Sequence, residues 1–149
     1  MSLQNMSKDG LKKINKFTSN SLEDTLIFGK DISKSLPDRG IIFLKGDLGS
    51  GKTTLAKSII NALTKTPFYL ITSPTFTYVH TYNGPKTIHH FDCYRIKTSA
   101  EFIELGLSDY LDSLCLIEWP ENINRLISQP HLTITLRYKA SGKREITYE

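Results

Sequence analysis

Apolar and polar positions recur along this chain with two different periods, and the changes of period predict an alternation of strands and helices. Runs typical of β-strands cover residues 15–18, 40–45, 68–71, 114–118, 132–138 and 144–148. Segments typical of helices cover residues 22–36, 53–63, 100–111 and 121–127. Ser21 stands where it can cap the first helix, and Pro37 ends that helix.

Two further strands are predicted within residues 75–96, where Asn83-Gly84 favours the positive φ angles of a tight hairpin turn. Ser141-Gly142 predicts a second turn, between the last two strands. Hairpins pair strands antiparallel, whereas strands that alternate with helices pair in parallel. The sequence therefore predicts an α/β fold, with one mixed β-sheet flanked by helices in a single domain.

A glycine-rich turn, GDLGSGKT at residues 46–53, links the strand 40–45 to the following helix. It matches the P-loop pattern, in which backbone N–H groups and the helix N-terminus surround a phosphate. Lys52 is placed to reach the β- and γ-phosphates of a nucleotide, and the Thr53 hydroxyl to bind Mg²⁺. We therefore expect a fold similar to that of the P-loop NTPases.

Two carboxylates follow buried strands and are candidates for catalysis. Glu118 ends the apolar run LCLI and is expected at the carboxyl end of a strand, where it can hold Mg²⁺ directly or through water. Asp92 is expected to orient the attacking water or the hydration shell of the metal. The alternatives are an exposed glutamate and a salt bridge from Asp92 to Arg95. Trp119 is expected over the site, in the core or at an interface.

Histidines and hydroxyl groups near Asp92 are further candidate ligands. Strand alternation places His90 and Asp92 on one face and divides them from His89, Phe91 and Cys93 on the other. A transition metal needs at least three converging ligands, so this division argues against such a site. The loop SPTFTYV carries Ser73, Thr75 and Thr77, and a hydroxyl there is suited to sensing a γ-phosphate.

Composition adds limits to this picture. The net charge of +4, from 19 basic and 15 acidic residues, is compatible with an anionic partner but does not require one. Cys93 and Cys115 lie in apolar stretches, which favours core positions and a reducing compartment over a disulfide. Apolar runs are far shorter than a membrane helix needs. We expect a cytoplasmic protein, with no membrane partner, in which a mobile tail at 1–14 precedes a P-loop domain at 15–149.

Several motifs in order resemble the TsaE family, also called YjeE, of small bacterial P-loop ATPases. They are SLEDT, GDLGSGKTTL, SPTFTYVHTY, HHFDCYRI, ELGLSDYL and LIEWPENI, and they extend from about residue 19 to residue 144. Many P-loop proteins carry the second motif, whereas the combination of the third, the fourth and the last is specific.

The resemblance implies roles for particular residues. It places Glu23 and Thr25 near the nucleotide base, and it places around the phosphates the residues Gly49, Ser50, Gly51, Lys52, Thr53 and Thr54. Thr53 and Glu118 would bind Mg²⁺, Asp92 resembles the essential acidic residue of the family, and Thr75 resembles a switch-loop threonine. The family commonly has glycine followed by arginine near its carboxyl end, but this chain reads Gly142-Lys143-Arg144. Either Lys143 or Arg144 is therefore the cation expected beside the nucleotide.

The resemblance also implies a function: Mg²⁺-dependent ATP binding and hydrolysis that support the TsaB–TsaD complex. That complex forms threonylcarbamoyladenosine in the anticodon loop of transfer RNA, so contact with RNA would be indirect, through the partners. Hydrolysis would be weak without them. The alternatives are a small-molecule kinase and a module that only senses nucleotide, because both use the same glycine-rich loop.

Overall fold

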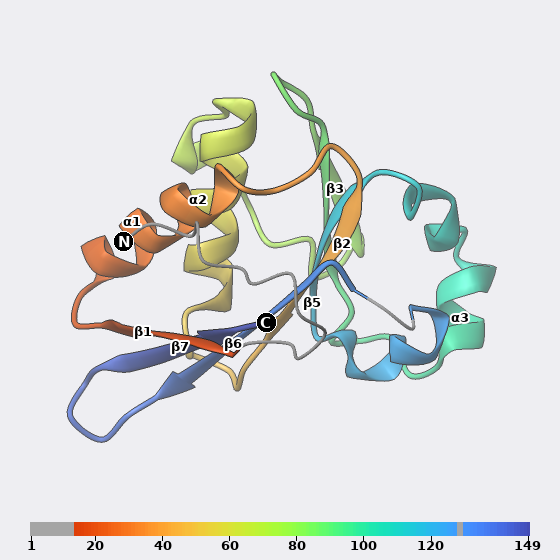
Figure 1. The fold of residues 1–149 in the computed structure, drawn as a ribbon. Coiled ribbons are helices and arrows are strands. Elements are labelled where there is room, and N and C mark those ends of the chain that lie inside the picture. The colour runs from red at the N-terminus through yellow and green to blue at the C-terminus, as the bar shows by residue number, and fades with distance from the viewer. Residues whose placement is uncertain (1–13, 128–129) are drawn as a thin grey trace.

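Seven strands form one sheet in the computed structural model, which describes residues 14–127 and 130–149 (Figure 1). Their order across the sheet is β1-β7-β6-β2-β5-β4-β3. The strands are β1 (Asn15–Ser19), β2 (Gly40–Lys45), β3 (Val79–Tyr82), β4 (Ile88–Asp92), β5 (Leu114–Glu118), β6 (Leu132–Tyr138) and β7 (Arg144–Tyr148). The longer helices are α1 (Leu22–Ser33), α2 (Lys52–Thr64) and α3 (Ser99–Glu104).

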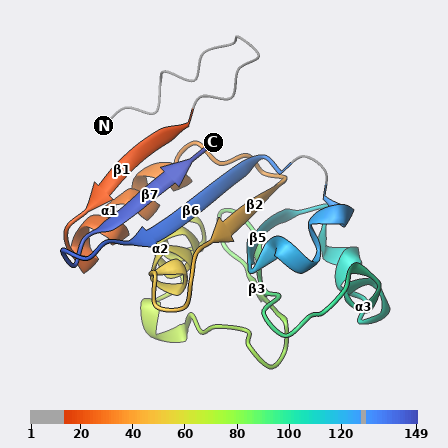
Figure 2. The same ribbon diagram turned by 90° about the horizontal axis from the view of Figure 1, so that it is seen from below.

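The sheet is mixed, with a parallel centre and antiparallel edges (Figure 2). Strand β2 lies between β5 and β6 and is parallel to both, and β4 is parallel to β5. The pairs β1–β7, β6–β7 and β3–β4 are antiparallel. This arrangement confirms the mixed α/β sheet that the sequence predicts. It also brings the carboxyl ends of β2, β4 and β5 to the same edge.

The two faces of the sheet carry separate hydrophobic clusters. Helices α1 and α2 cover one face, and α3 with its neighbouring short helices covers the other (Figure 1). Alternate residues of one strand join different clusters: Leu116 packs on the α1–α2 side, and Ile117 packs on the α3 side. A strand buried on both faces needs apolar residues at consecutive positions, which explains the continuous run LCLI.

Local signals explain where the helices begin and how closely they pack. The Ser21 side chain accepts a hydrogen bond from the Asp24 N–H, and so caps α1 as expected. Gly29 on α1 faces Ser58 on α2, where a Cβ atom at Gly29 would lie 2.5 Å from the Ser58 Oγ. The pair α1–α2 can therefore approach this closely only with glycine at this position.

Four short 3₁₀ turns lie in segments where the sequence predicts regular elements. The expected strand at 68–71 is wrong: Phe68–Leu70 is an exposed 3₁₀ turn whose backbone bonds are local. The expected helix at 100–111 is interrupted by Gly106 at φ 77°, and continues as a second 3₁₀ turn at Leu107–Tyr110. Residues 121–127 do not form one helix either, because two 3₁₀ turns, Pro120–Asn122 and Asn124–Leu126, occupy this segment.

The β3–β4 hairpin is present, but its turn differs from the expected one. Residues 83–87 connect the strands, and neither Asn83 nor Gly84 has a positive φ angle. A Cβ atom at Gly84 would lie 2.3 Å from the carbonyl oxygen of Thr64, at the end of α2. Glycine is required there for close approach to the helix and not for the turn angle.

Of the tail expected at residues 1–14, all but Ile14 lies outside the described residues. Within the described ranges, no helix has both the length and the apolar character needed to cross a membrane.

Candidate nucleotide-binding site

The glycine-rich turn lies between the carboxyl end of β2 and the start of α2. Gly51 has φ 105° and stands directly before α2, a conformation that side chains rarely adopt. A Cβ atom at Gly46 would lie 2.6 Å from the carbonyl oxygen of Leu136 on β6. The loop therefore depends on glycine both for its backbone angles and for its close packing against β6.

Lys52 turns back over this loop. Its ammonium group donates hydrogen bonds to the carbonyl oxygens of Gly46 and Asp47, the second at 3.0 Å. It also lies 4.1 Å from the centre of the Trp119 ring, within range of a cation–π contact. Burial lowers the pKa of Lys52, while nearby carboxylates, first Glu118, oppose this shift. The lysine thus holds a positive charge against the concave side of the loop.

Glu118 is the buried centre of a hydrogen-bonded group that joins three elements. It ends β5 and is only 2% exposed. Its Oε1 accepts a hydrogen bond from the Thr53 hydroxyl on α2 at 3.2 Å, and its Oε2 lies 2.8 Å from Nε2 of His90 on β4. The expected exposed-glutamate alternative is therefore wrong. The carboxylate is held beside the first turn of α2.

Asp92 ends β4 directly beside Glu118 in the parallel register. One carboxylate oxygen accepts from the Tyr94 N–H at 3.0 Å, and the other lies 3.2 Å from the Ser73 hydroxyl and 3.4 Å from the Thr75 hydroxyl. No ion pair joins Asp92 to Arg95 in the described part of the chain, so the salt-bridge alternative fails. Asp92 instead connects the loop after α2 to the edge that carries Glu118.

Trp119 and Tyr94 form an aromatic wall beside these carboxylates. Trp119 follows β5 with φ 56°, a left-handed conformation that is uncommon for a bulky residue. Its ring lies 5.0 Å from that of Tyr94, measured between centroids. The indole lies over Lys52 on one side and packs against the edge of the α3-side hydrophobic cluster on the other.

Arg144 supplies a cation from the opposite edge of the loop. It begins β7, and its side chain lies 3.2 Å from the position that a Cβ atom at Gly51 would occupy. Its guanidinium group lies 5.7 Å from the centre of the Tyr138 ring, and its Nε has no hydrogen-bond partner among the residues described. Lys143 is exposed and does not line the cleft. Of the two expected cations, the structure brings Arg144 to the loop.

These groups surround a cleft of about 500 Å³. It is lined by Leu48, Gly49, Gly51, Lys52, Thr53, Thr54, Ser73, Thr75, Asp92, Tyr94, Glu118, Trp119 and Arg144. A larger hollow of about 790 Å³, whose lining includes Asp38, Lys86 and Asp112, lies apart from the glycine-rich loop. Convergent polar groups, rather than volume, identify the smaller cleft as the candidate site.

Four sequence-predicted residues do not line this cleft. Ser50 is buried in the loop, and Lys143 is exposed. Thr25 is buried, with its hydroxyl 2.7 Å from that of Ser19, and Glu23 is exposed on the first turn of α1. Their proposed contacts with nucleotide remain predictions.

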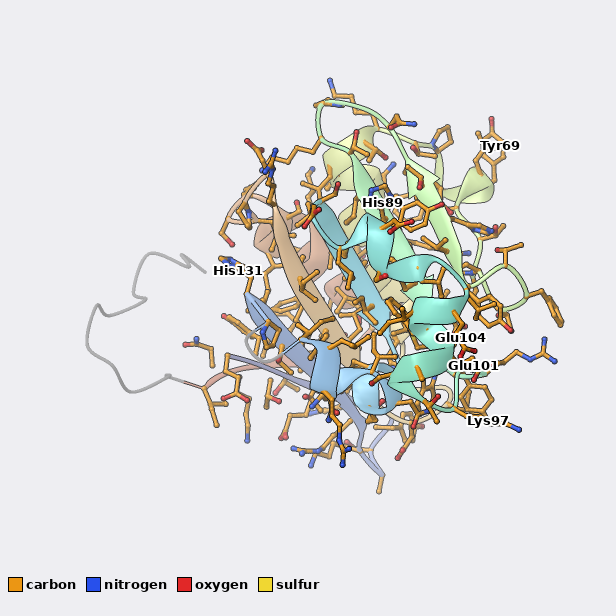
Figure 3. All side chains as sticks on the ribbon, turned by 90° about the vertical axis from the view of Figure 1, so that its right-hand side faces the viewer. Tyr69, His89, Lys97, Glu101, Glu104 and His131 are labelled. Carbon is orange, nitrogen blue, oxygen red and sulfur yellow. The ribbon has the colours of Figure 1, made fainter. Side chains whose placement is uncertain are left out.

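The donor set suits a small, hard cation. Thr53 and Glu118 offer oxygen atoms, the ligands that Mg²⁺ prefers, and they already lie within hydrogen-bond distance of each other. Within residues 14–127 and 130–149, no group of three histidine, cysteine or acidic side chains is arranged to hold a metal. The two histidines of the HHFD segment lie on different faces: His90 faces Glu118, whereas His89 lies on the α3 side, with its ring 4.9 Å from that of Tyr110 (Figure 3).

The sequence alone did not predict two features of this site, one contact and one backbone angle. It grouped His90 with Asp92 on one face but did not pair His90 with Glu118. It also did not anticipate the positive φ angle of Trp119. The strand alternation carried the signal for the first, since His90, Asp92 and Glu118 all occupy positions that face α2 once β4 and β5 are paired. The second had no sequence signal, because a residue before proline ordinarily favours extended backbone angles.

Fold and cleft together define an α/β protein with a glycine-rich loop at the carboxyl end of the central parallel strands of a mixed sheet. The family profile described as threonylcarbamoyl adenosine biosynthesis protein TsaE matches residues 19–146. The chain therefore belongs to the TsaE family, and its place is in the biosynthesis of threonylcarbamoyladenosine on transfer RNA.

Individual relatives support this assignment. The tRNA threonylcarbamoyladenosine biosynthesis protein TsaE of Rickettsia prowazekii is 39% identical, over 85% of this chain and 89% of its own. The protein of the same name from Treponema pallidum is 36% identical, over 87% and 96% respectively. The crystal structure of YdiB from Bacillus subtilis matches with a TM-score of 0.73 and 31% identity, and the match covers 91% of this chain and 84% of that one.

Proposed function

We propose that this chain binds Mg²⁺-ATP in the cleft at the glycine-rich loop and hydrolyses the bond between the β- and γ-phosphates. The contact that carries the proposal is the 3.2 Å hydrogen bond between Thr53 and Glu118. It joins the first turn of α2 to a carboxylate at the end of the neighbouring strand, a pairing typical of Mg²⁺ sites in P-loop NTPases.

The loop and α2 would bind the phosphates. The backbone N–H groups from Gly49 to Thr54 and the positive end of the α2 dipole favour an anion at this position. Lys52 would exchange its two loop carbonyl acceptors for the β- and γ-phosphates. Arg144 would add a second positive charge beside the nucleotide, because its guanidinium group already lies against Gly51.

The metal would be held by Thr53 and Glu118. When bound, Mg²⁺ supplies positive charge that offsets the negative charge developing on the phosphate oxygens. Glu118 is available for this role at the end of β5, where its Oε1 accepts the hydrogen bond from the Thr53 hydroxyl.

Asp92 would orient the attacking water. It lies next to Glu118 in register, and its second oxygen contacts Ser73 and Thr75, on a loop that lines the same cleft. Water would attack the γ-phosphorus as the bond to the β–γ bridging oxygen breaks, and ADP and phosphate would leave. Thr75 would sense the γ-phosphate, since its hydroxyl can exchange Asp92 for a phosphate oxygen.

The reaction would serve the complex of TsaB and TsaD in forming threonylcarbamoyladenosine, with transfer RNA contacted through these partners. Membership of the TsaE family supports the pathway. The partners and a cytoplasmic location are part of the proposal.

The test is phosphate release from Mg²⁺-ATP by the full chain, alone and with TsaB and TsaD. Glu118→Ala and Asp92→Ala should each abolish release while nucleotide binding survives. Glu104→Ala is the matched control, because Glu104 is an exposed carboxylate on α3 (Figure 3). We expect release to rise with the partners present in the wild type and in the control alike.

Two other outcomes would contradict hydrolysis and indicate a different function. Binding without release, with partners present, would indicate a nucleotide-sensing switch. Transfer of the γ-phosphate to a small acceptor instead of water would indicate a kinase.

A further inference from the structure

His90 is a buried polar residue for which the proposed mechanism has no role. It is 0% exposed, in the middle of β4, and its imidazole Nε2 lies 2.8 Å from Oε2 of Glu118. Its Nδ1 is buried and has no hydrogen-bond partner in the described ranges. A buried imidazole with one free nitrogen is costly in a core, so its single contact calls for a reason.

We propose that His90 is a positioning residue that fixes the Glu118 carboxylate for Mg²⁺ bound with the nucleotide. This inference rests on the proposed function and deepens it. His90 would donate its Nε2–H to Oε2, which leaves Oε1 beside Thr53 as the oxygen that meets the metal. His90 itself would touch neither metal nor nucleotide.

The geometry explains why a donor is needed at this point. Glu118 is nearly fully buried, so an oxygen without a partner would be desolvated and uncompensated. The carboxylate would then rotate toward another donor, and this change would move Oε1 away from Thr53. A hydrogen bond from the second coordination layer commonly changes metal affinity by about 10–100-fold.

The fold holds the two side chains in register. Strands β4 and β5 are parallel, with His90 opposite Leu116 and Asp92 opposite Glu118. His90 therefore lies two residues before Asp92, the residue paired with Glu118, and on the same face of the sheet. Both strands are buried along their whole length, which restricts the imidazole to this contact.

Two substitutions separate a positioning role from a general structural one. The amide nitrogen of glutamine can take the place of Nε2, so His90→Gln keeps a donor near Glu118. The shorter side chain of His90→Asn places its amide near the position of Nδ1 and leaves Glu118 without that donor. Both variants put an amide in the same buried place, so they serve as a matched pair.

The experiment measures ADP affinity of the full chain, with Mg²⁺ and with EDTA, for the wild type and both variants. We expect His90→Asn to lose about 10–100-fold of the gain in affinity that Mg²⁺ gives, with affinity in EDTA unchanged. His90→Gln should retain most of that gain. Thermal unfolding of each variant reports the structural effect separately.

A double-mutant cycle sharpens the result. In a Glu118→Gln background, His90→Asn should cause no further loss of the Mg²⁺-dependent gain, because the carboxylate that it positions is gone. A loss of equal size in both backgrounds would overturn the proposal, and so would an unchanged gain in His90→Asn.

A measurement on the wild type tests the proposal even if the variants do not fold. Nitrogen NMR of the four histidines should show His90 with its proton on Nε2, and its signals should shift when Mg²⁺ joins the ADP complex. A proton on Nδ1 instead would overturn the positioning role while leaving the proposed function intact. Failure of the wild type to bind ADP at all would overturn both.

Discussion

Alternate residues of β4 and β5 face opposite sides of the sheet, and the two sides end differently. Toward α2 the apolar residues Ile88 and Leu116 give way to the polar residues His90, Asp92 and Glu118. Toward α3 the polar residue His89 comes first, and the positions at the strand ends are apolar, with Phe91, Cys93, Cys115 and Ile117 in one cluster. The same two strands thus build a site on one face and a support for it on the other.

This difference teaches how a small sheet can carry buried charge. The charged groups of the α2 side have hydrogen-bond partners on neighbouring elements, whereas the α3 side contains two cysteines whose burial raises each pKa to about 12. Neither thiol is suited to react near neutral pH. Substitutions on the two faces should therefore affect different properties.

The largest effect is expected from removing the Asp92 charge. Asp92→Asn should lower ATP hydrolysis in the presence of the partners by about 10²–10⁴-fold, because it removes the charge of the group that we propose orients the attacking water. ADP affinity should change little. Asp109→Asn, an exposed position on the α3 side, is the control. Equal activity of the two variants would contradict the role of Asp92.

Phe91, the neighbour of Asp92 on the opposite face, should affect stability instead. Phe91→Ala should lower the free energy of unfolding by about 3–5 kcal/mol, since this fully buried ring packs against Phe102 at 5.7 Å. Denaturant unfolding measures the change. Phe76→Ala removes an exposed ring and should leave the midpoint nearly unchanged. An unchanged midpoint in Phe91→Ala would contradict a core position for this ring.

A smaller loss is expected where α1 meets α2. Gly29→Ala places a methyl group 2.5 Å from the Ser58 Oγ, so the helices must separate, at a cost of about 1–3 kcal/mol. The pair Gly29→Ala with Ser58→Gly should recover much of this loss, because it restores the space. Additive effects in the double variant would argue against a direct clash.

The smallest effect is expected at the exposed end of the sheet. The hydrogen bond from Lys16, together with the charges of Lys139 and Arg137, lowers the pKa of Glu145 below its ordinary 4.5. A lowered pKa means that the charged form is favoured in the folded protein, so its stabilisation is present above pH 4.5 and is lost as the pH falls.

The difference in melting temperature between wild type and Glu145→Gln should accordingly shrink between pH 7 and pH 3, and it should also shrink in high salt. A difference that grows with acid would contradict the pairing.

Much of the fold follows from local sequence signals. The predicted strand 40–45, the Ser21 cap and the strand 114–118 agree with the structure. The errors lie in segments where exposed or glycine-interrupted apolar residues imitate regular elements, as at Phe68–Leu70 and Gly106. A local pattern cannot show whether a segment will pair with a neighbouring strand of the sheet.

The candidate site divides in the same way. The sequence by itself determined the glycine-rich loop, the places of Lys52 and Thr53 at its end, and the position of Glu118 at a strand end. Spacing within one segment defines each of these features. Only the tertiary structure decided that Glu118 meets His90 and Thr53, and that Arg144 instead of Lys143 lies at the loop. These contacts join residues from separate strands and helices, and their register is set by sheet pairing and helix packing across the whole domain.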